Sequence, residues 1–343
     1  MGWRKWVLAV ALAAATIAPA AASAEGKFGA LVFGDYYNFF EDHDSLTATQ
    51  NGFWIRRVNL TWDEKFDDAF SARLRIETAS PGSFLPDNQD IMITYMKDAW
   101  LRWKHGNQNV YLGLTQTPSH SFIEEFWGYR YLEKIPGELQ GYYGSRDMGL
   151  AALGTIGEAK RFGYHVMVGN GSGTRNELDG RKKASGAVRF QLTKALVVEV
   201  YGDYEDRAYD TDRMTFRGSL GYKAERVRGA VEYIQQTRDQ SNADSYDLQV
   251  VSGFAAGQVA EKVWLVGRVD RAMDPGASNP GAPYFPMSSQ VASTFVLVGV
   301  ELKARENIAF TPNVEMAFYD SPDDGAPKPE NDILGRVTFM YKY

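Results

Sequence analysis

Four histidines are the residues with the broadest catalytic and metal-binding chemistry in this chain. They are His43, His105, His120 and His165, and none of them stands at the spacing of a metal-binding or His-x-x-x-His motif. The chain contains no cysteine, which removes thiol chemistry and thiolate metal sites. We therefore expect no metal site, no cofactor and no catalytic centre built on these residues.

Two short motifs could suggest an enzyme. Ser119, His120 and Ser121 place nucleophile and base residue types side by side, as an outer-membrane barrel hydrolase does at its rim, but no third member is identifiable. Residues 169–173 (GNGSG) have the composition of a phosphate-binding loop, yet they end a predicted strand and precede no helix. A hairpin loop explains that stretch better, and the sequence predicts a protein that is not an enzyme.

Arginine offers a different chemistry, because its planar fork matches carboxylate and phosphate groups. Assigning inward and outward faces by alternation gives an interior with about 17 basic and about 12 acidic side chains. The arginines predicted to line a pore are Arg57, Arg73, Arg75, Arg102, Arg217, Arg226, Arg228 and Arg268. An anion preference follows if they face the solute. The alternative is that they pair with carboxylates across strands and only keep the wall rigid.

One long segment without strand pattern, residues 117–145, carries seven large aromatic side chains. Such a loop needs a place to bury them. Folding inward against a barrel wall would provide it, and would set Glu124, Glu125, Arg130 and Lys134 around a constriction. The alternative is an extracellular loop that packs on its neighbours or on another subunit.

The elements that must position these residues are strands. Leu196, Val198 and Val200 alternate with residues of the opposite face, and the same two-residue period recurs from residue 26 to the last residue. The predicted strands are 26–39, 52–63, 70–80, 94–104, 109–116, 146–156, 161–170, 183–191, 196–205, 212–223, 226–238, 244–257, 262–271, 291–303, 306–319 and 331–343. This pattern is typical of a transmembrane antiparallel β-barrel of about 16 strands, with 14 or 18 as alternatives.

The predicted connections alternate in length. They are short after even-numbered strands, as at 105–108 and 304–305, and several are long after odd-numbered ones, as at 117–145 and 272–290. Short periplasmic turns on one rim and long extracellular loops on the other match an outer-membrane barrel with both termini in the periplasm.

The N-terminus has the features of a signal peptide over residues 1–24, which leaves 25–343 as the barrel domain. Arg4 and Lys5 precede an apolar run, and Ala22-Ser23-Ala24 forms a small-residue cleavage site. The remainder holds 35 Lys and Arg against 43 Asp and Glu, a formal charge of −8, which argues against a nucleic-acid partner. No later stretch approaches 18 apolar residues, so the sequence predicts no helical membrane span.

Several stretches resemble the phosphate-selective porin O and P family. They are 53–60 (FWIRRVNL), 70–75 (FSARLR), 98–103 (DAWLRW), 110–118 (VYLGLTQTP), 144–150 (GSRDMGL), 163–164 and 169–173. The resemblance covers residues 50–175 and is only architectural beyond them. It implies a 16-stranded homotrimeric porin whose third extracellular loop folds into the channel and which passes anions such as phosphate.

Together, these features predict an outer-membrane porin of a Gram-negative bacterium. It would be a water-filled channel for passive diffusion of small hydrophilic solutes, with an anion (phosphate-like) preference, and its partners would be outer-membrane lipid and those solutes. The alternatives are an outer-membrane barrel hydrolase and a structural barrel without transport.

Overall fold

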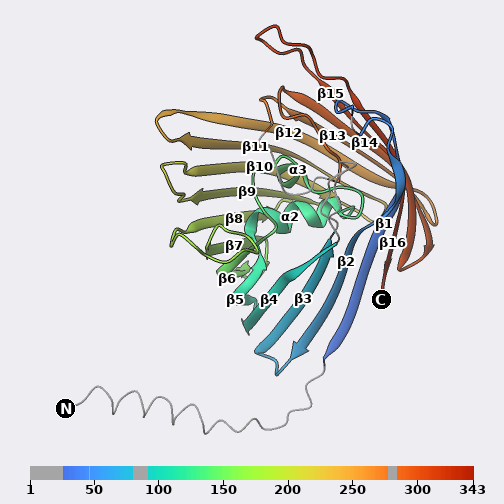
Figure 1. Ribbon diagram of the computed structural model, residues 1–343. Coiled ribbons are helices and arrows are strands. Elements are labelled where there is room, and N and C mark those ends of the chain that lie inside the picture. Colours follow the sequence, from blue (N-terminus) through green and yellow to red (C-terminus); the bar gives the residue numbers. More distant parts are fainter. Residues whose placement is uncertain (1–25, 46, 80–91, 277–283) are drawn as a thin grey trace.

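The computed structural model describes residues 26–45, 47–79, 92–276 and 284–343, so the predicted signal peptide lies outside the described residues. Sixteen strands form the barrel: β1 Lys27–Glu41, β2 Asn51–Lys65, β3 Phe70–Ala79, β4 Ile93–His105, β5 Gln108–Gln116, β6 Arg146–Ile156, β7 Phe162–Gly169, β8 Lys183–Gln191, β9 Leu196–Glu205, β10 Arg213–Lys223, β11 Val227–Gln240, β12 Ala243–Ala260, β13 Val263–Ala272, β14 Ser293–Arg305, β15 Ile308–Tyr319 and β16 Asp332–Lys342. Two helices, α2 Pro118–Trp127 and α3 Pro136–Leu139, lie within the ring of strands (Figure 1).

Each strand pairs antiparallel with the next, and β1 pairs with β16, so the sheet closes on itself. Closure is what allows a β-structure to stand in hydrocarbon, because no strand edge is left with unpaired backbone groups. The predicted antiparallel barrel and its count of 16 strands are confirmed. No helix of the described residues is long and apolar enough to cross a membrane.

The two rims differ in the length of their connections. On one rim the turns hold two to five residues, such as 106–107 between β4 and β5 and 261–262 between β12 and β13. On the other rim most connections are longer, up to the segment 117–145 between β5 and β6. The exception is 241–242, where β11 and β12 continue as an extended hairpin and replace the loop.

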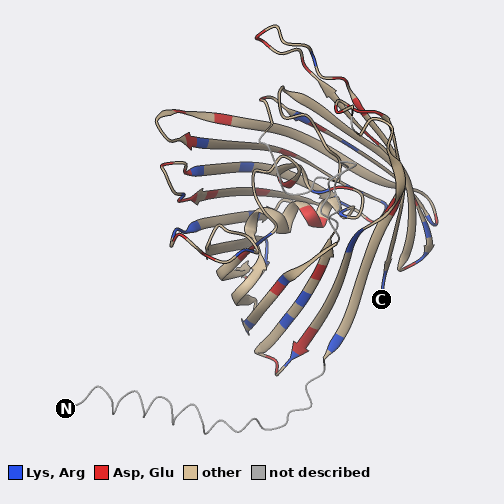
Figure 2. Ribbon diagram, in the orientation of Figure 1, with Lys and Arg blue, Asp and Glu red and all other residues tan. Residues whose placement is uncertain are grey.

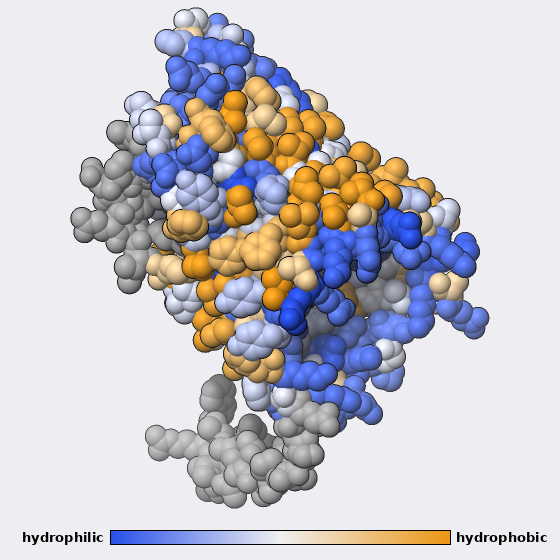
Figure 3. Space-filling model, turned by 90° about the vertical axis from the view of Figure 1, so that its right-hand side faces the viewer, coloured by the Kyte–Doolittle hydropathy of each residue, from blue (hydrophilic) through white to orange (hydrophobic). Residues whose placement is uncertain are grey.

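The wall has an apolar outer face and a polar inner face. On β9, Glu199, Tyr201 and Asp203 are buried inside the barrel, whereas Val200 and Tyr204 between and beyond them are exposed outside. On the side shown in Figure 3, hydrophobic residues gather in a band between hydrophilic regions. Basic and acidic residues neighbour one another along β3 and β4 (Figure 2). This is the two-sided pattern of a barrel that stands in lipid and encloses water.

Two bulges interrupt the alternation on the inner wall. Opposite β1 the register passes from Arg57 to Ile55, so Arg56 is an extra residue, and both arginines are buried inside. Opposite β3 it passes from Asp98 to Met96, which leaves Lys97 as the extra residue. A bulge puts two consecutive side chains on one face. Gly34 lies opposite the first bulge, where an added Cβ would stand 2.3 Å from the Trp54 carbonyl oxygen.

Candidate functional site

The interior of the barrel is occupied by the segment 117–145 (Figure 1). Its main helix, α2, starts at Pro118, whose fixed φ suits the first helical position, directly after extended Thr117. The helix ends at Gly128, which takes a left-handed conformation (φ 64°) and donates its N–H to the Glu124 carbonyl at 2.9 Å. These caps limit the helix to a length that fits across the lumen.

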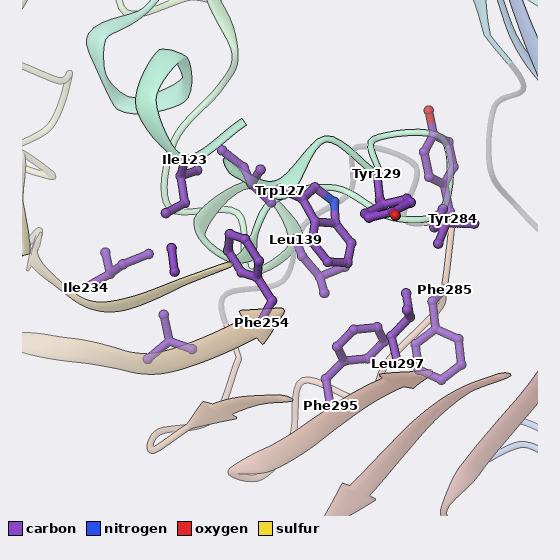
Figure 4. Packing of buried hydrophobic residues seen from close by; sticks show 14 of the residues in the cluster. Ile123, Trp127, Tyr129, Leu139, Ile234, Phe254, Tyr284, Phe285, Phe295 and Leu297 are labelled. Atoms are coloured by element: carbon purple, nitrogen blue, oxygen red, sulfur yellow. The ribbon is translucent and has the colours of Figure 1, made fainter. Parts of the chain in front are cut away.

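The aromatic residues of this segment pack on the inner wall. Phe122, Phe126 and Trp127 are at most 3% exposed, and the Trp127 ring lies 5.1 Å from Phe254 of β12, edge to face. Figure 4 shows Trp127 beside Phe254, with further apolar side chains of the segment and wall around them. Burying these rings removes apolar area that would cost about 25 cal/mol per Å² in water. The hydrophobic effect therefore holds the segment against the wall.

Polar side chains of the wall hold the backbone of the same segment. Several of them donate hydrogen bonds to its carbonyl oxygens: Arg56 to Leu132 at 2.7 Å, Gln236 to Tyr142 at 2.6 Å, Arg238 to Gly141 at 3.2 Å, Arg217 to Ser119 and Arg268 to Lys134. The donors belong to β2, β10, β11 and β13, which span much of the barrel circumference. A segment fixed at so many points has one position in the lumen.

The anchoring arginines are also neutralised by wall carboxylates. Arg56 pairs with Asp35 at 2.5 Å, and Arg217 pairs with Glu199 at 2.5 Å, all with fully buried side chains. Arg268 bonds both oxygens of Asp270. Because each buried charge has a partner, these arginines fix the segment without adding net charge to the space that remains open.

Charges within the segment pair with each other as well. Arg130 bonds both carboxylate oxygens of Glu138, at 2.5 and 2.6 Å. Burial by itself would raise the pKa of Glu138, but the positive charge of Arg130 holds that pKa well below its usual range. His120 lies 3.7 Å from both Glu124 and Glu138, and its burial lowers its pKa, so it is neutral near pH 7. Arg130 is therefore neutralised by Glu138 and is not an unpaired charge beside an aperture.

Glu125 and Lys134 complete the predicted constriction set. The Glu125 side chain is half exposed and lies 3.4 Å from the Lys223 ammonium. Lys134 is buried and lines the first of the two cavities described next. The segment thus presents few unpaired charges to the lumen.

Two cavities remain between the segment and the wall formed by β3 to β9. The first, about 370 Å³, is lined by Lys97, Lys183 and the 170–182 connection of the long-loop rim. The second, about 480 Å³, is lined by Arg73, Arg189 and residues near the short-turn rim, such as Asn107. Arg146 lines both. The cavities therefore lie toward opposite rims of the barrel and approach each other at this arginine.

The charged side chains that line these cavities are mostly basic, and four of them pair with carboxylates behind the lining: Arg73 with Asp63, Lys97 with Glu77, Lys183 with Asp203 and Arg189 with Glu199. The basic side chains of the cavities are Arg73, Lys97, Lys134, Arg146, Arg175, Lys183, Arg189, Arg207 and Arg213. Against these nine stand four acidic side chains, Asp98, Glu138, Asp147 and Glu205. The chain as a whole has a formal charge of −6, so the basic excess is local to this space.

The predicted pore-lining arginines divide into three groups. Arg73 borders the second cavity and pairs with Asp63 at 2.6 Å, and Arg75 and Arg102 stand on the same wall. The second group faces inward beneath the segment or the aromatic rings next to it: Arg57, Arg217, Arg228 and Arg268. Arg57, Arg217 and Arg268 are buried and Arg228 is partly buried, and none of the four lines either cavity.

Arg226 forms the third group and was placed wrongly. It is exposed in the turn 224–226 between β10 and β11, because β11 begins at Val227 rather than at residue 226. The sequence prediction had extended the strand by one residue into the turn.

Several basic residues of the interior were missed, among them Arg56, Lys97 and Arg146. Arg56 and Lys97 are the extra residues of the two bulges, so strict alternation assigns them to the outer face. Arg146 is the first residue of β6 and pairs with Asp98 at 2.5 Å. The adjacent charged pairs Arg56-Arg57 and Lys97-Asp98 are a sequence signal that could have revealed the bulges, since one of each pair would otherwise face lipid.

The Ser119-His120-Ser121 motif lies inside the barrel. Ser119 is buried and its hydroxyl lies 3.0 Å from that of Thr117, whereas His120 lies between two glutamates. Ser121 lies 3.4 Å from His165, and no carboxylate within the described residues bonds to that imidazole. The motif does not form a nucleophile–base pair at the rim.

Known proteins share this architecture at low sequence identity. An anion-selective porin from Comamonas acidovorans superposes with a TM-score of 0.68 at 10% identity, over 93% of this chain and 100% of that one. OmpF of Salmonella typhi, in complex with daunomycin, gives 0.65 at 12% identity over 93% and 97%. The trimer form of OmpT, an outer membrane protein of Vibrio cholerae, gives 0.61 at 14% identity over 93% and 99%. No known family model matches the sequence, and no curated protein sequence matches it either. At this identity the likeness establishes the porin-type barrel fold.

Proposed function

We propose that this chain is an outer-membrane porin of a Gram-negative bacterium, through which small hydrophilic solutes diffuse passively with a preference for anions. The observation that carries the proposal is the basic space between the segment 117–145 and the wall of β3 to β9. Its two cavities lie toward opposite rims and both border Arg146, which is the arrangement that a channel requires. The apolar outer wall supports insertion in lipid.

The anion preference rests on the local field. Nine basic against four acidic side chains around a narrow water-filled space attract anions and repel cations, and the low-dielectric wall focuses that field. The fold likeness to a porin whose name describes it as anion-selective is consistent with this preference. Phosphate is one anion that this lining would suit, because Arg146 and Arg73 offer planar donors.

The test is a planar-bilayer recording of the mature protein in a KCl gradient. The expected reversal potential has the sign of chloride permeation and grows as the salt concentration falls. Replacing chloride by phosphate on one side then measures which anion passes better. A reversal potential of the cation sign would refute the anion preference, and the absence of any conductance would refute the porin.

We also propose that the segment 117–145 sets the width of the pore. Its anchors to four strands and its buried aromatic rings support a fixed position in the lumen. Replacing residues 122–137 with a Gly-Ser linker should raise single-channel conductance while the barrel still inserts. Unchanged conductance together with failed assembly would assign the segment to the subunit or loop surface instead.

A homotrimer is the assembly that we propose, supported by the trimer form of the Vibrio cholerae protein with the same fold. Cross-linking of the detergent-solubilised protein should give a band at three times the mass of one chain. Passive diffusion needs no catalytic group, and none of the contacts of Ser119, Ser121 or the histidines favours a hydrolase.

A further inference from the structure

A group of three side chains lies on the long-loop rim, away from the proposed channel. Asp42 and His43 directly follow β1, and Asp332 is the first residue of β16. His43 Nδ1 is 2.8 Å from Asp332 Oδ1 and 3.6 Å from Asp42 Oδ1. One possible ligand atom from each residue lies within 4.8 Å of the other two. No sequence motif indicates this group, because His43 and Asp332 are 289 positions apart.

Both carboxylates are buried, and one oxygen of Asp42 lacks a hydrogen-bond partner. Asp332 accepts the His43 backbone N–H at 2.7 Å and the Tyr319 hydroxyl. Asp42 accepts the Asp44 N–H at 2.8 Å through Oδ1, but its buried Oδ2 has no hydrogen-bond partner. The side chains of both aspartates are 0% exposed. Within the described residues, His43 is the only basic side chain that pairs with either of them.

This arrangement has the composition of a transition-metal site. Two buried carboxylates carry more negative charge than a single imidazole can balance, and a buried charge without a partner is costly. Oxygen ligands from carboxylates together with one imidazole nitrogen form a mixed donor set that suits Zn²⁺. In a tetrahedral zinc site with bonds of about 2.0–2.2 Å, neighbouring ligand atoms stand roughly 3.3–3.6 Å apart. The observed 2.8 and 3.6 Å require only small side-chain adjustments.

We propose that Asp42, His43 and Asp332 bind a divalent transition-metal ion, with Zn²⁺ as the fitting example. The His43 side chain is 22% exposed, which gives the ion access from the outside and leaves room for a water ligand. The bound ion joins the connection 42–50 to β16 at the seam where the first and last strands meet. The β1–β16 pairing is irregular just there, between Phe39 and Glu41, so the ion reinforces a weak point of barrel closure.

The site is tested by titrating ZnCl₂ into the untagged mature protein in detergent micelles, with calorimetric detection. The expected result is one Zn²⁺ per chain and a higher unfolding temperature that EDTA reverses. Asp42→Asn and His43→Gln should each weaken binding at least tenfold. The matched control is His105→Gln, which removes an exposed histidine whose ring stacks on Trp103, and it should bind as the wild type does.

A second measurement on the wild-type protein does not depend on how the variants fold. The X-ray absorption spectrum of the Zn²⁺-loaded protein should show one imidazole ligand among oxygen ligands. No stoichiometric binding would mean that His43 and Asp332 form only an ion pair, and the proposal fails. Equal loss in His105→Gln, or a spectrum with several imidazoles, would overturn it as well. None of these outcomes depends on channel selectivity.

Discussion

Arg146 is the residue whose removal should change ion selectivity most directly. Among the residues that the structure describes, it is the one common to both cavities, and it stands where they approach each other. Its partner Asp98, at 2.5 Å, remains when Arg146 is replaced by Gln, so the local charge becomes one unit more negative. The substitution keeps a polar side chain of similar length and leaves the aromatic packing of the segment 117–145 untouched.

The size of the effect follows from the field of one charge. A unit charge about 7 Å from a passing ion contributes roughly 0.6–2.4 kcal/mol for effective dielectric constants of 80 to 20. Screening with a Debye length of about 10 Å at 0.1 M reduces the lower end to about 0.3 kcal/mol. The anion loses this stabilisation and the cation gains it. The chloride-to-potassium permeability ratio should therefore fall about threefold, or more where the local dielectric constant is low.

The assay is the reversal potential of Arg146→Gln in a KCl gradient, compared with the wild type at 0.1 M and 1 M salt. The shift toward cations should be large at 0.1 M and small at 1 M, where the Debye length is about 3 Å. Arg271→Gln is the matched control, because Arg271 also pairs with an aspartate, Asp320, but outside the cavities. Equal reversal potentials for the wild type and Arg146→Gln at 0.1 M would show that ions do not pass this residue.

Two further substitutions and one deletion test how the barrel and its inner segment are held. Arg56→Ala leaves the buried Asp35 carboxylate without its ion-pair partner, which should lower the free energy of unfolding by about 3–5 kcal/mol. The urea midpoint of unfolding should fall, and single-channel currents should become noisier because the segment 117–145 is held less firmly. Trp127→Ala removes a ring that is 1% exposed, which should lower the free energy of unfolding by about 3–5 kcal/mol and raise the mean conductance. A conductance and a urea midpoint equal to those of the wild type would contradict the packing of this ring on the wall. Deleting residues 340–343 removes the end of β16 that pairs with Leu31 to Phe33 of β1. Heat-modifiable, membrane-inserted protein should then be lost. Normal insertion of this truncated chain would argue against closure of the barrel through this strand.

Much of the fold could be predicted from the sequence because a barrel that stands in lipid repeats one rule in every strand. Side chains alternate between two solvents, so β9 with its buried Glu199 and exposed Val200 is visible as a period of two. The sheet must then close on itself, because an open edge strand would leave unpaired backbone groups in hydrocarbon. The connection between β11 and β12 does not follow the predicted alternation of short and long connections. It is short because both strands extend beyond the rim, where a loop was expected.

The candidate site was predictable only where the alternation is undisturbed. Arg73 follows the rule and borders a cavity, whereas Arg56 and Lys97 break it, because a bulge turns an extra residue inward. Which of the inward arginines remain open to solutes depends on where the segment 117–145 rests. Its resting place is set by long-range contacts such as that between Trp127 and Phe254, and no local pattern encodes them.

The number of inward-facing arginines alone does not give the charge that a solute would meet in the pore. Arg217 and Arg268 face inward as the alternation predicts, yet they donate to backbone carbonyls of the segment and pair with wall carboxylates. An inward charge that is fully used for anchoring sets the shape of the passage, and only a charge left at a cavity surface sets its field. Arg146 lines both cavities although it pairs with Asp98. We therefore expect the shape of the passage and its ion selectivity to depend on different arginines.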